Sequence, residues 1–253
     1  MERLHDASRG LDALIDAFQR VCEGSPRRFF SPLGEVDGSL FPRVAFFGQD
    51  RTREAPRIGL VAGLSAADTL GPQALLEFFE RVALQPNLAA GFNLLLYPLS
   101  NLRAYRDVAE VQDLLAINWA RELLPETTWL VRELHAYDFS ALVLLAPGAP
   151  DGTLRIELQG HGAHEAFVLA QPLPGQRAGD YTAYPFPVEW VPQDRRRGIG
   201  PSAVVEDLAT PPAILTLRYP GDWEEPLTRL ALGQTLRVFL SNYRSQLSYG
   251  LNL

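Results

Sequence analysis

The sequence contains few of the residues from which metal clusters and disulfide scaffolds are built. Its 253 residues include one cysteine and four histidines. The single cysteine, Cys22, cannot form an internal disulfide. We expect it to lie in the core, because it shares the apolar face of an amphipathic helix predicted over residues 9–23. A reactive thiol is the alternative.

Basic charge and long apolar runs are also scarce. Lys and Arg number 23 against 30 Asp and Glu, which gives a net charge of -7. Binding to nucleic acid or to an anionic membrane needs a basic face, so we expect neither partner. No apolar run approaches the roughly 20 residues of a membrane span, and no apolar stretch typical of a signal peptide follows the charged N-terminus. We therefore expect a cytoplasmic protein.

What the chain does contain is a strand, loop, helix, strand pattern in its first half. The apolar run 58–62 is rich in β-branched residues and predicts a buried strand. Apolar residues at helical spacing predict a helix over 72–83, with Pro72 suited to its first turn. A second apolar run, 92–97, predicts the next strand. Such a βαβ unit implies parallel pairing of its two strands.

The alternation of strands and helices continues along the chain. Apolar runs predict strands over 43–47, 139–145 and 213–217, and alternating residues predict an edge strand over 154–158. The spacing of apolar residues predicts a last helix over 226–243. Together these elements indicate an α/β fold.

Proline marks one irregular segment. Residues 172–201 contain six prolines, which are excluded from helix interiors and from central strands. We therefore predict an irregular Pro-rich insertion there. No repeat or linker divides the chain, and its length fits one domain over residues 1–253.

Five short segments follow one another in a characteristic order, residues 47–48, 59–68, 95–101, 116–119 and 215–220. Taken together, they resemble landmarks of the zinc carboxypeptidase superfamily, especially its aspartoacylase and succinylglutamate desuccinylase-like branch. The resemblance implies a single domain with a mixed, largely parallel sheet flanked by helices. Another doubly wound α/β domain is the alternative.

The resemblance also indicates where zinc ligands and the catalytic base would be, and these positions are altered. Ser65 stands where the family has its first histidine, and no histidine occurs near Ala146, where the second should be. Only Asp68 keeps a ligand type, whereas a catalytic zinc needs three protein ligands. Arg218 replaces the glutamate base, and a guanidinium cannot accept a proton. We therefore predict that zinc is absent.

The substrate-anchoring pair is half preserved. Asn118 matches the family asparagine, but Trp119 replaces the arginine that follows it. Arg103 or Arg106 could stand in for the family's second anion-binding arginine. We predict a catalytically inactive protein that keeps the former cleft for binding or scaffolding, with a small anionic ligand or a protein as partner. The residues predicted for this cleft are Ser65, Asp68, Arg106, Asn118 and Arg218.

Two other functions remain open on the sequence. His161 and His164 are three residues apart with Glu165 beside them, and on a helix both imidazoles would share one face. These residues could hold a metal in a rebuilt site, which would make the protein a metal-dependent amide or peptide hydrolase. Alternatively, Arg218 and Arg106 could convert the cleft into an anion-binding module.

Overall fold

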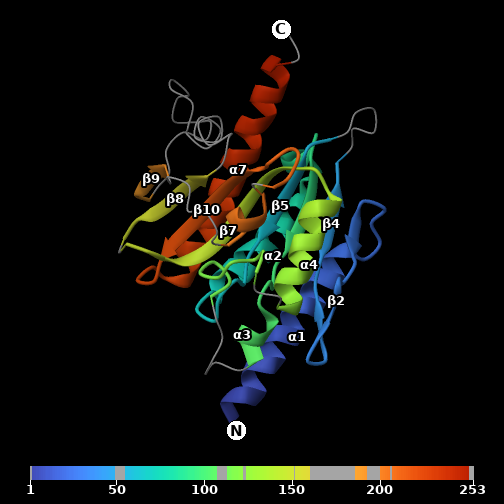
Figure 1. Ribbon diagram of the computed structural model, residues 1–253, viewed down its shortest axis with the longest axis vertical. Helices are drawn as coiled ribbons and strands as arrows, with labels where there is room; N and C mark the ends of the chain where they lie inside the picture. Colours follow the sequence, from blue (N-terminus) through green and yellow to red (C-terminus); the bar gives the residue numbers. More distant parts are fainter. Residues whose placement is uncertain are drawn as a thin grey trace.

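A mixed sheet of eight strands runs through the middle of the molecule, in the order β1-β4-β6-β5-β7-β10-β8-β9 (Figure 1). The computed structural model describes residues 2–48, 55–106, 113–121, 124–150, 152–159, 186–192, 200–205 and 207–250. The strands are β1 (Arg28–Phe30), β4 (Val44–Phe47), β5 (Arg57–Val61), β6 (Asn93–Tyr97), β7 (Phe139–Ala149), β8 (Leu154–Gln159), β9 (Val188–Pro192) and β10 (Ala213–Pro220).

The four central strands are parallel, which places their carboxyl ends at one edge of the sheet. β5 pairs in parallel with β6 and β7, and β7 pairs in parallel with β10. Toward the two sides, β4 runs antiparallel to β6, and β8 runs antiparallel to β10. The predicted α/β fold with a mixed, largely parallel sheet is confirmed.

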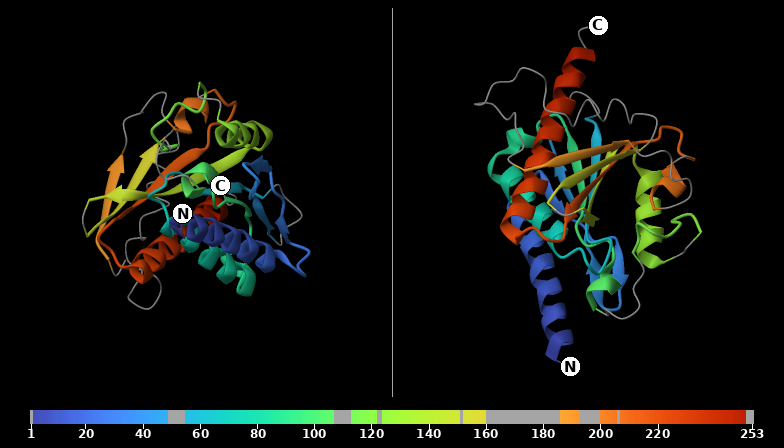
Figure 2. Two further views of the ribbon diagram at one scale, coloured as in Figure 1. Left: turned by 90° about the horizontal axis from the view of Figure 1, so that it is seen from below. Right: turned by 90° about the vertical axis from the view of Figure 1, so that its left-hand side faces the viewer.

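Helices cover both faces of the sheet, so the central strands are apolar on both sides. One face carries α1 (Glu2–Cys22), α2 (Leu70–Leu84) and α7 (Glu225–Gly250), and the other carries α4 (Pro125–Ala136) and α6 (Ser202–Val205) (Figure 2). In β5, Ile58 and Leu60 join the core cluster of the first face, and Val61 joins that of the second. Short helices η1 (Pro86–Ala89) and α3 (Leu102–Arg106) flank β6.

Cys22 lies in the core, as predicted. Its side chain is buried against the first face of the sheet. Burial raises the pKa of its thiol to about 11, although the charge of Arg28 acts in the opposite direction. A thiol with this pKa is almost entirely protonated at neutral pH, and the protonated form is a poor nucleophile.

Several predicted boundaries are wrong. β8 is not an edge strand, because it lies between β10 and β9. β9 is an ordered edge strand inside the segment predicted to be irregular, and β7 continues through Pro147 to Ala149. The first helix begins at Glu2 rather than at residue 9. Most of 172–201 lies outside the described residues.

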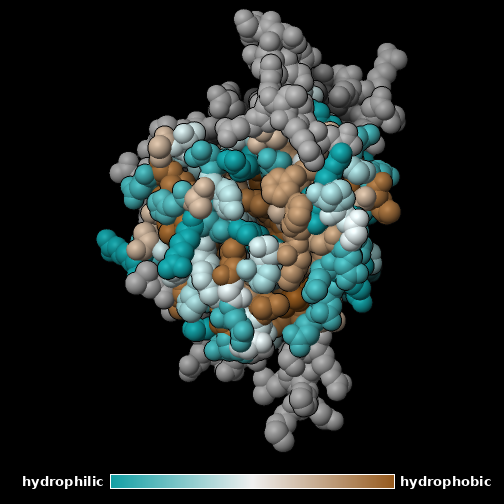
Figure 3. All heavy atoms as spheres, turned by 90° about the vertical axis from the view of Figure 1, so that its right-hand side faces the viewer, coloured by the Kyte–Doolittle hydropathy of each residue, from teal (hydrophilic) through white to brown (hydrophobic). Residues whose placement is uncertain are grey.

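A small hairpin of β2 (Gly34–Val36) and β3 (Ser39–Phe41) lies beside the β1 edge of the sheet. Apolar side chains show between polar ones on this side of the molecule (Figure 3). Phe29, Leu40 and Phe47 are exposed large apolar residues of these strands. None of the helices in the described part of the chain combines the length and apolar character needed to cross a membrane.

Candidate functional site

Asp68 lies in the turn between β5 and α2, where its carboxylate is fully enclosed. The side chain is 0% exposed. The backbone N–H of Gly63 donates to Oδ2 at 2.6 Å, and that of Gly71 donates to Oδ1 at 2.9 Å. The Tyr219 hydroxyl also donates to Oδ1, at 2.8 Å, and the Tyr105 hydroxyl donates to the Asp68 carbonyl oxygen. This carboxylate therefore caps the start of α2 and ties it to β10.

Burial dominates the electrostatics of this turn. It raises the pKa of Asp68 to about 6, although the hydrogen bonds from Tyr219 and from the backbone lower it. Burial also raises the pKa of Tyr219 and of Tyr105, and in both cases the nearby Asp68 charge adds to the shift. Both tyrosines thus remain protonated hydrogen-bond donors at neutral pH.

The turn that carries Asp68 is held by backbone contacts to the neighbouring strand end. Gly63 has a positive φ of 68°, and a Cβ there would lie 2.9 Å from the Pro98 carbonyl oxygen. The N–H groups of Ser100 and Asn101 donate to the carbonyls of Ala62 and Gly63. A glycine is required because the backbone is left-handed and closely packed there.

Arg218 lies near the carboxyl end of β10 and forms an ion pair with Glu157 of β8. Its Nε is 3.1 Å from Oε1 of Glu157, and the two side chains are 19% and 5% exposed. The guanidinium also donates to the Pro147 carbonyl oxygen at 3.4 Å. The charge of Arg218 is therefore compensated by a buried carboxylate of the same protein.

Asp68 and Arg218 contact opposite sides of β10. Arg218 and Tyr219 are consecutive in this strand, so their side chains point to different faces. Tyr219 belongs to the core cluster that includes α2 and α7, and its hydroxyl contacts Asp68. Arg218 instead points to the face shared with Glu157. The Asp68 carboxylate and the Arg218 guanidinium therefore do not meet.

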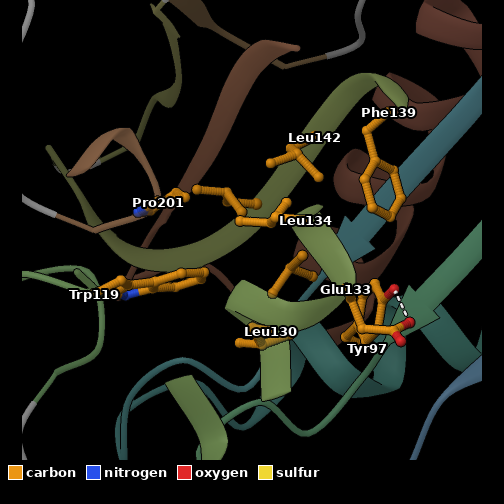
Figure 4. Close-up of a pocket in the computed structure, with 10 residues that line it drawn as sticks. Tyr97, Trp119, Leu130, Glu133, Leu134, Phe139, Leu142 and Pro201 are labelled. Atoms are coloured by element: carbon orange, nitrogen blue, oxygen red, sulfur yellow. Dashed lines mark hydrogen bonds between the residues drawn. The ribbon is translucent and has the colours of Figure 1, made fainter. Parts of the chain in front are cut away.

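Trp119 is buried at the position where the resemblance implies an anchoring arginine. Its indole N–H donates to the Leu114 carbonyl oxygen at 2.7 Å, and the side chain is 3% exposed. Together with Pro201 it lines one end of a pocket between α4 and the sheet (Figure 4). Leu134, Leu142 and Leu144 also line this pocket, whose interior of about 10 Å³ has room for about one water molecule. Its lining is almost wholly apolar.

The other end of this pocket carries polar groups that already have partners. The Tyr97 hydroxyl donates to Glu133 at 2.8 Å, as Figure 4 shows. The Arg43 guanidinium donates to both Glu133 carboxylate oxygens at 2.9 Å. Burial lowers the pKa of Arg43, but the hydrogen bond and charge of Glu133 outweigh burial and raise it. This network joins β4, β6 and α4 and leaves the pocket apolar.

The remaining predicted cleft residues are placed as follows. Ser65 is partly exposed, and its carbonyl oxygen accepts the Asp68 N–H. Asn118 forms a bridge with Gly200, and its Oδ1 accepts the Ala120 N–H. Arg106 ends α3, of which the backbone is described. In the described part of the chain, no hydrogen bond or ion pair brings the side chains of Ser65, Asn118 and Arg218 together.

The two further candidates are Arg103 and the group of His161, His164 and Glu165. Arg103, considered as a second anion-binding arginine, lies between two carboxylates, with Nε 3.6 Å from Asp37 and 3.9 Å from Glu126. His161, His164 and Glu165 lie outside the described residues. Within the described ranges, no three His, Cys, Asp or Glu side chains are grouped closely enough to hold a metal ion.

The residues at the positions where the resemblance implies zinc ligands do not fit a zinc ion. Asp68 is enclosed and accepts several hydrogen bonds, and Ser65 supplies a neutral hydroxyl. Ala146, where a histidine would be needed, is buried and pairs with Arg218. Three donors of the N, S or O type therefore do not converge there.

The comparisons with known proteins concern the fold. A Burkholderia cenocepacia metallo-carboxypeptidase superimposes with a TM-score of 0.69 at 12% identity, over 90% of this chain and 68% of that one. The fold is carboxypeptidase-like. A Pseudomonas aeruginosa metallo-carboxypeptidase in complex with (2-guanidinoethylmercapto)succinic acid gives a TM-score of 0.60 at 13% identity, over 89% and 67% of the two chains. The thrombin-activatable fibrinolysis inhibitor gives 0.59 at 12%, over 89% and 72%. No family model and no curated protein matches the sequence.

Some residues of this region could not be identified from sequence alone. Tyr219 and Tyr105 are separated from Asp68 by 151 and 37 positions, and nothing in their local pattern indicates a contact. Glu157 belongs to the alternating segment 154–158, in which a solvent-facing side chain is expected, but it is only 4% exposed. A charged residue in such a position is usually paired, and Arg218 is the partner.

Proposed function

We propose that this protein is a catalytically inactive member of the carboxypeptidase fold, which keeps the former active-site region for binding or scaffolding. The observation that carries the proposal is the position of Asp68. Its carboxylate, the one zinc-ligand type retained in sequence, is 0% exposed and caps α2. A ligand used in this way cannot also coordinate a metal that must be open to water and substrate.

The former base position supports the same proposal. A hydrolytic base must take a proton from water, and Arg218 is permanently protonated. The neighbouring carboxylate of Glu157 is buried and held in an ion pair by Arg218. The chain thus has an arginine–carboxylate pair where the resemblance implies a free glutamate.

The ion pair between Arg218 and Glu157 also argues against the alternative function, an anion-binding module. A guanidinium attracts an anionic ligand most strongly when its own charge is uncompensated, and Glu157 compensates Arg218. Phosphate or succinate should therefore stabilise the wild-type protein and the Arg218→Met variant to the same small extent. Arg155→Met is a matched control, since Arg155 is on β8 and pairs with Glu189. Loss of stabilisation in Arg218→Met alone would favour the anion-binding module.

The main experiment measures zinc and hydrolysis on the same preparation. The purified protein is incubated with zinc, dialysed and analysed by elemental analysis, and it is then assayed on acyl-amino acids and short peptides. We expect less than stoichiometric zinc and no turnover above the uncatalysed rate.

One bound zinc per chain with hydrolysis would contradict the proposal. In that case the His161→Ala/His164→Ala variant locates the metal. Loss of zinc in this variant would identify the rebuilt metal site, and unchanged zinc would point back to Asp68.

A further inference from the structure

Glu126, in the first turn of α4, is a buried carboxylate whose hydrogen-bonding capacity is unused. It is 1% exposed. Among the residues that the structure describes, neither of its carboxylate oxygens has a hydrogen-bond partner. Its ion-pair partner there is Arg103, whose Nε lies 3.9 Å from Oε1, too far for a hydrogen bond. That Nε is itself buried and has no hydrogen-bond partner within the same residues.

The charges around Glu126 do not balance. Arg103 also faces Asp37, with Nε 3.6 Å from Oδ2. Among the described residues, one guanidinium is therefore shared between two carboxylates, and these three groups together carry a net charge of -1. Asp37 is 63% exposed in its side chain and is stabilised by water, whereas Glu126 is not. A buried charge without hydrogen bonds is costly, and such groups in folded proteins usually contact water or a bound ion.

We propose that the Glu126 carboxylate binds a small monovalent cation, such as ammonium, potassium or the ammonium group of a primary amine. A cation of one positive charge balances this net charge, and N–H donors or an ion satisfy the two unused oxygens. A polyvalent metal fits less well, because the described residues provide no group of three metal ligands. Arg103 keeps its contact with Asp37 and lies beside the bound cation.

This site is separate from the proposed loss of hydrolysis. The two Glu126 oxygens belong to α4 and face Arg103 of α3, whereas the Asp68 carboxylate contacts Gly63, Gly71 and Tyr219. Failure of the cation proposal would leave the zinc and hydrolysis results unchanged, and the reverse also holds.

The test compares thermal unfolding in ammonium, potassium, methylammonium and tetramethylammonium chlorides at constant ionic strength. Tetramethylammonium has the same charge but is bulky and has no N–H donors. In ammonium or potassium chloride, the melting temperature should be about 2–4 °C higher than in tetramethylammonium chloride. This applies at a concentration where cation-bound protein exceeds free protein about fivefold. An equal rise in methylammonium would identify an amine group as the natural ligand. A rise confined to ammonium and potassium would identify a free ion.

The control variants attribute the effect to one carboxylate. Glu126→Gln removes the charge with little change in shape and should abolish the cation dependence. Glu35→Gln, at an exposed position of the nearby β2 strand, should keep it. A cation dependence that persists in Glu126→Gln, or no dependence in the wild-type protein, would overturn the proposal.

A second measurement does not depend on any variant folding. With ¹⁵N-ammonium, a bound and shielded ion gives a proton signal distinct from that of free ammonium. Absence of this signal at saturating ammonium would mean that Glu126 is hydrated by water only, and the proposal would be wrong.

Discussion

At the scale of single residues, we expect Asp68 to make the stability of the folded protein depend on pH. Burial raises its pKa from the ordinary 3.8 to about 6 in the folded protein. The folded state therefore binds the proton more tightly than the unfolded state. This contribution to stability is complete below about pH 4 and is lost as the pH rises through 6.

The change that tests this is Asp68→Asn, which removes the titrating group. Other carboxylates titrate in both proteins and cancel in the comparison. The free energy of unfolding of the wild type minus that of the variant should increase by about 1 kcal/mol from pH 7 to pH 5. Urea unfolding at both pH values measures it. A difference that does not change with pH would mean that the hydrogen bonds to Asp68 outweigh its burial.

Asp68 also shows which part of the candidate site could be predicted from the sequence. The pattern of apolar residues indicated correctly that Asp68 follows a buried strand, in a turn that leads into a helix. Its role in that turn depends on where the side chain points, and the decisive partner, Tyr219, is distant in sequence. Ser65 and Arg218 were predicted to share a cleft because each lies near the end of a strand. The position of a residue along its strand does not specify toward which face of the sheet its side chain points. Their role in a shared cleft stays a prediction.

At the scale of secondary-structure elements, two helical glycines should respond in opposite ways to alanine. Gly71, in α2, has no room, because a Cβ would lie 2.4 Å from Asp68 Oδ1. Gly71→Ala should lower the free energy of unfolding by about 1–3 kcal/mol. Gly233, in α7, has no atom within 4 Å of an added Cβ. Gly233→Ala should raise it by about 0.5–1 kcal/mol.

Chemical denaturation of the two variants beside the wild type measures both changes. A stable Gly71→Ala protein would mean that the Asp68 side chain moves readily out of its capping position. Circular dichroism of both folded variants checks that the helices themselves are kept.

The strands that could be predicted from the sequence are those that are buried on both faces. β5, β6 and β7 are continuous apolar runs, and no surface helix or loop produces that pattern at this length. β8 was misplaced because its alternation, with Glu157 turned to one face, is typical of an edge strand. In the structure, the Glu157 carboxylate on the polar face of β8 instead forms an ion pair with Arg218. β9 was missed because proline is compatible with an edge strand, whereas the prediction treated the whole segment as irregular.

At the scale of the whole molecule, parallel strands bring distant segments to one edge without bringing their side chains to one point. β5, β7 and β10 end side by side. Asp68 nevertheless packs with Tyr219 and α2 on one face, while Arg218 pairs with Glu157 on the other. The element order of a metallo-carboxypeptidase is thus compatible with an arrangement in which the retained carboxylate serves the fold.

This arrangement predicts that supplying the residue types implied by the resemblance will not create a metal centre. The triple variant Ser65→His/Ala146→His/Arg218→Glu supplies two imidazoles and the base. It leaves Asp68 enclosed by Gly63, Gly71 and Tyr219. Zinc needs all its ligands about 2 Å from one point. We therefore expect no zinc binding tighter than micromolar in competition with a chromophoric chelator, and no hydrolysis. Tight stoichiometric binding would show that Asp68 leaves its cap when imidazoles are present, because the metal then outweighs the hydrogen bonds that hold it.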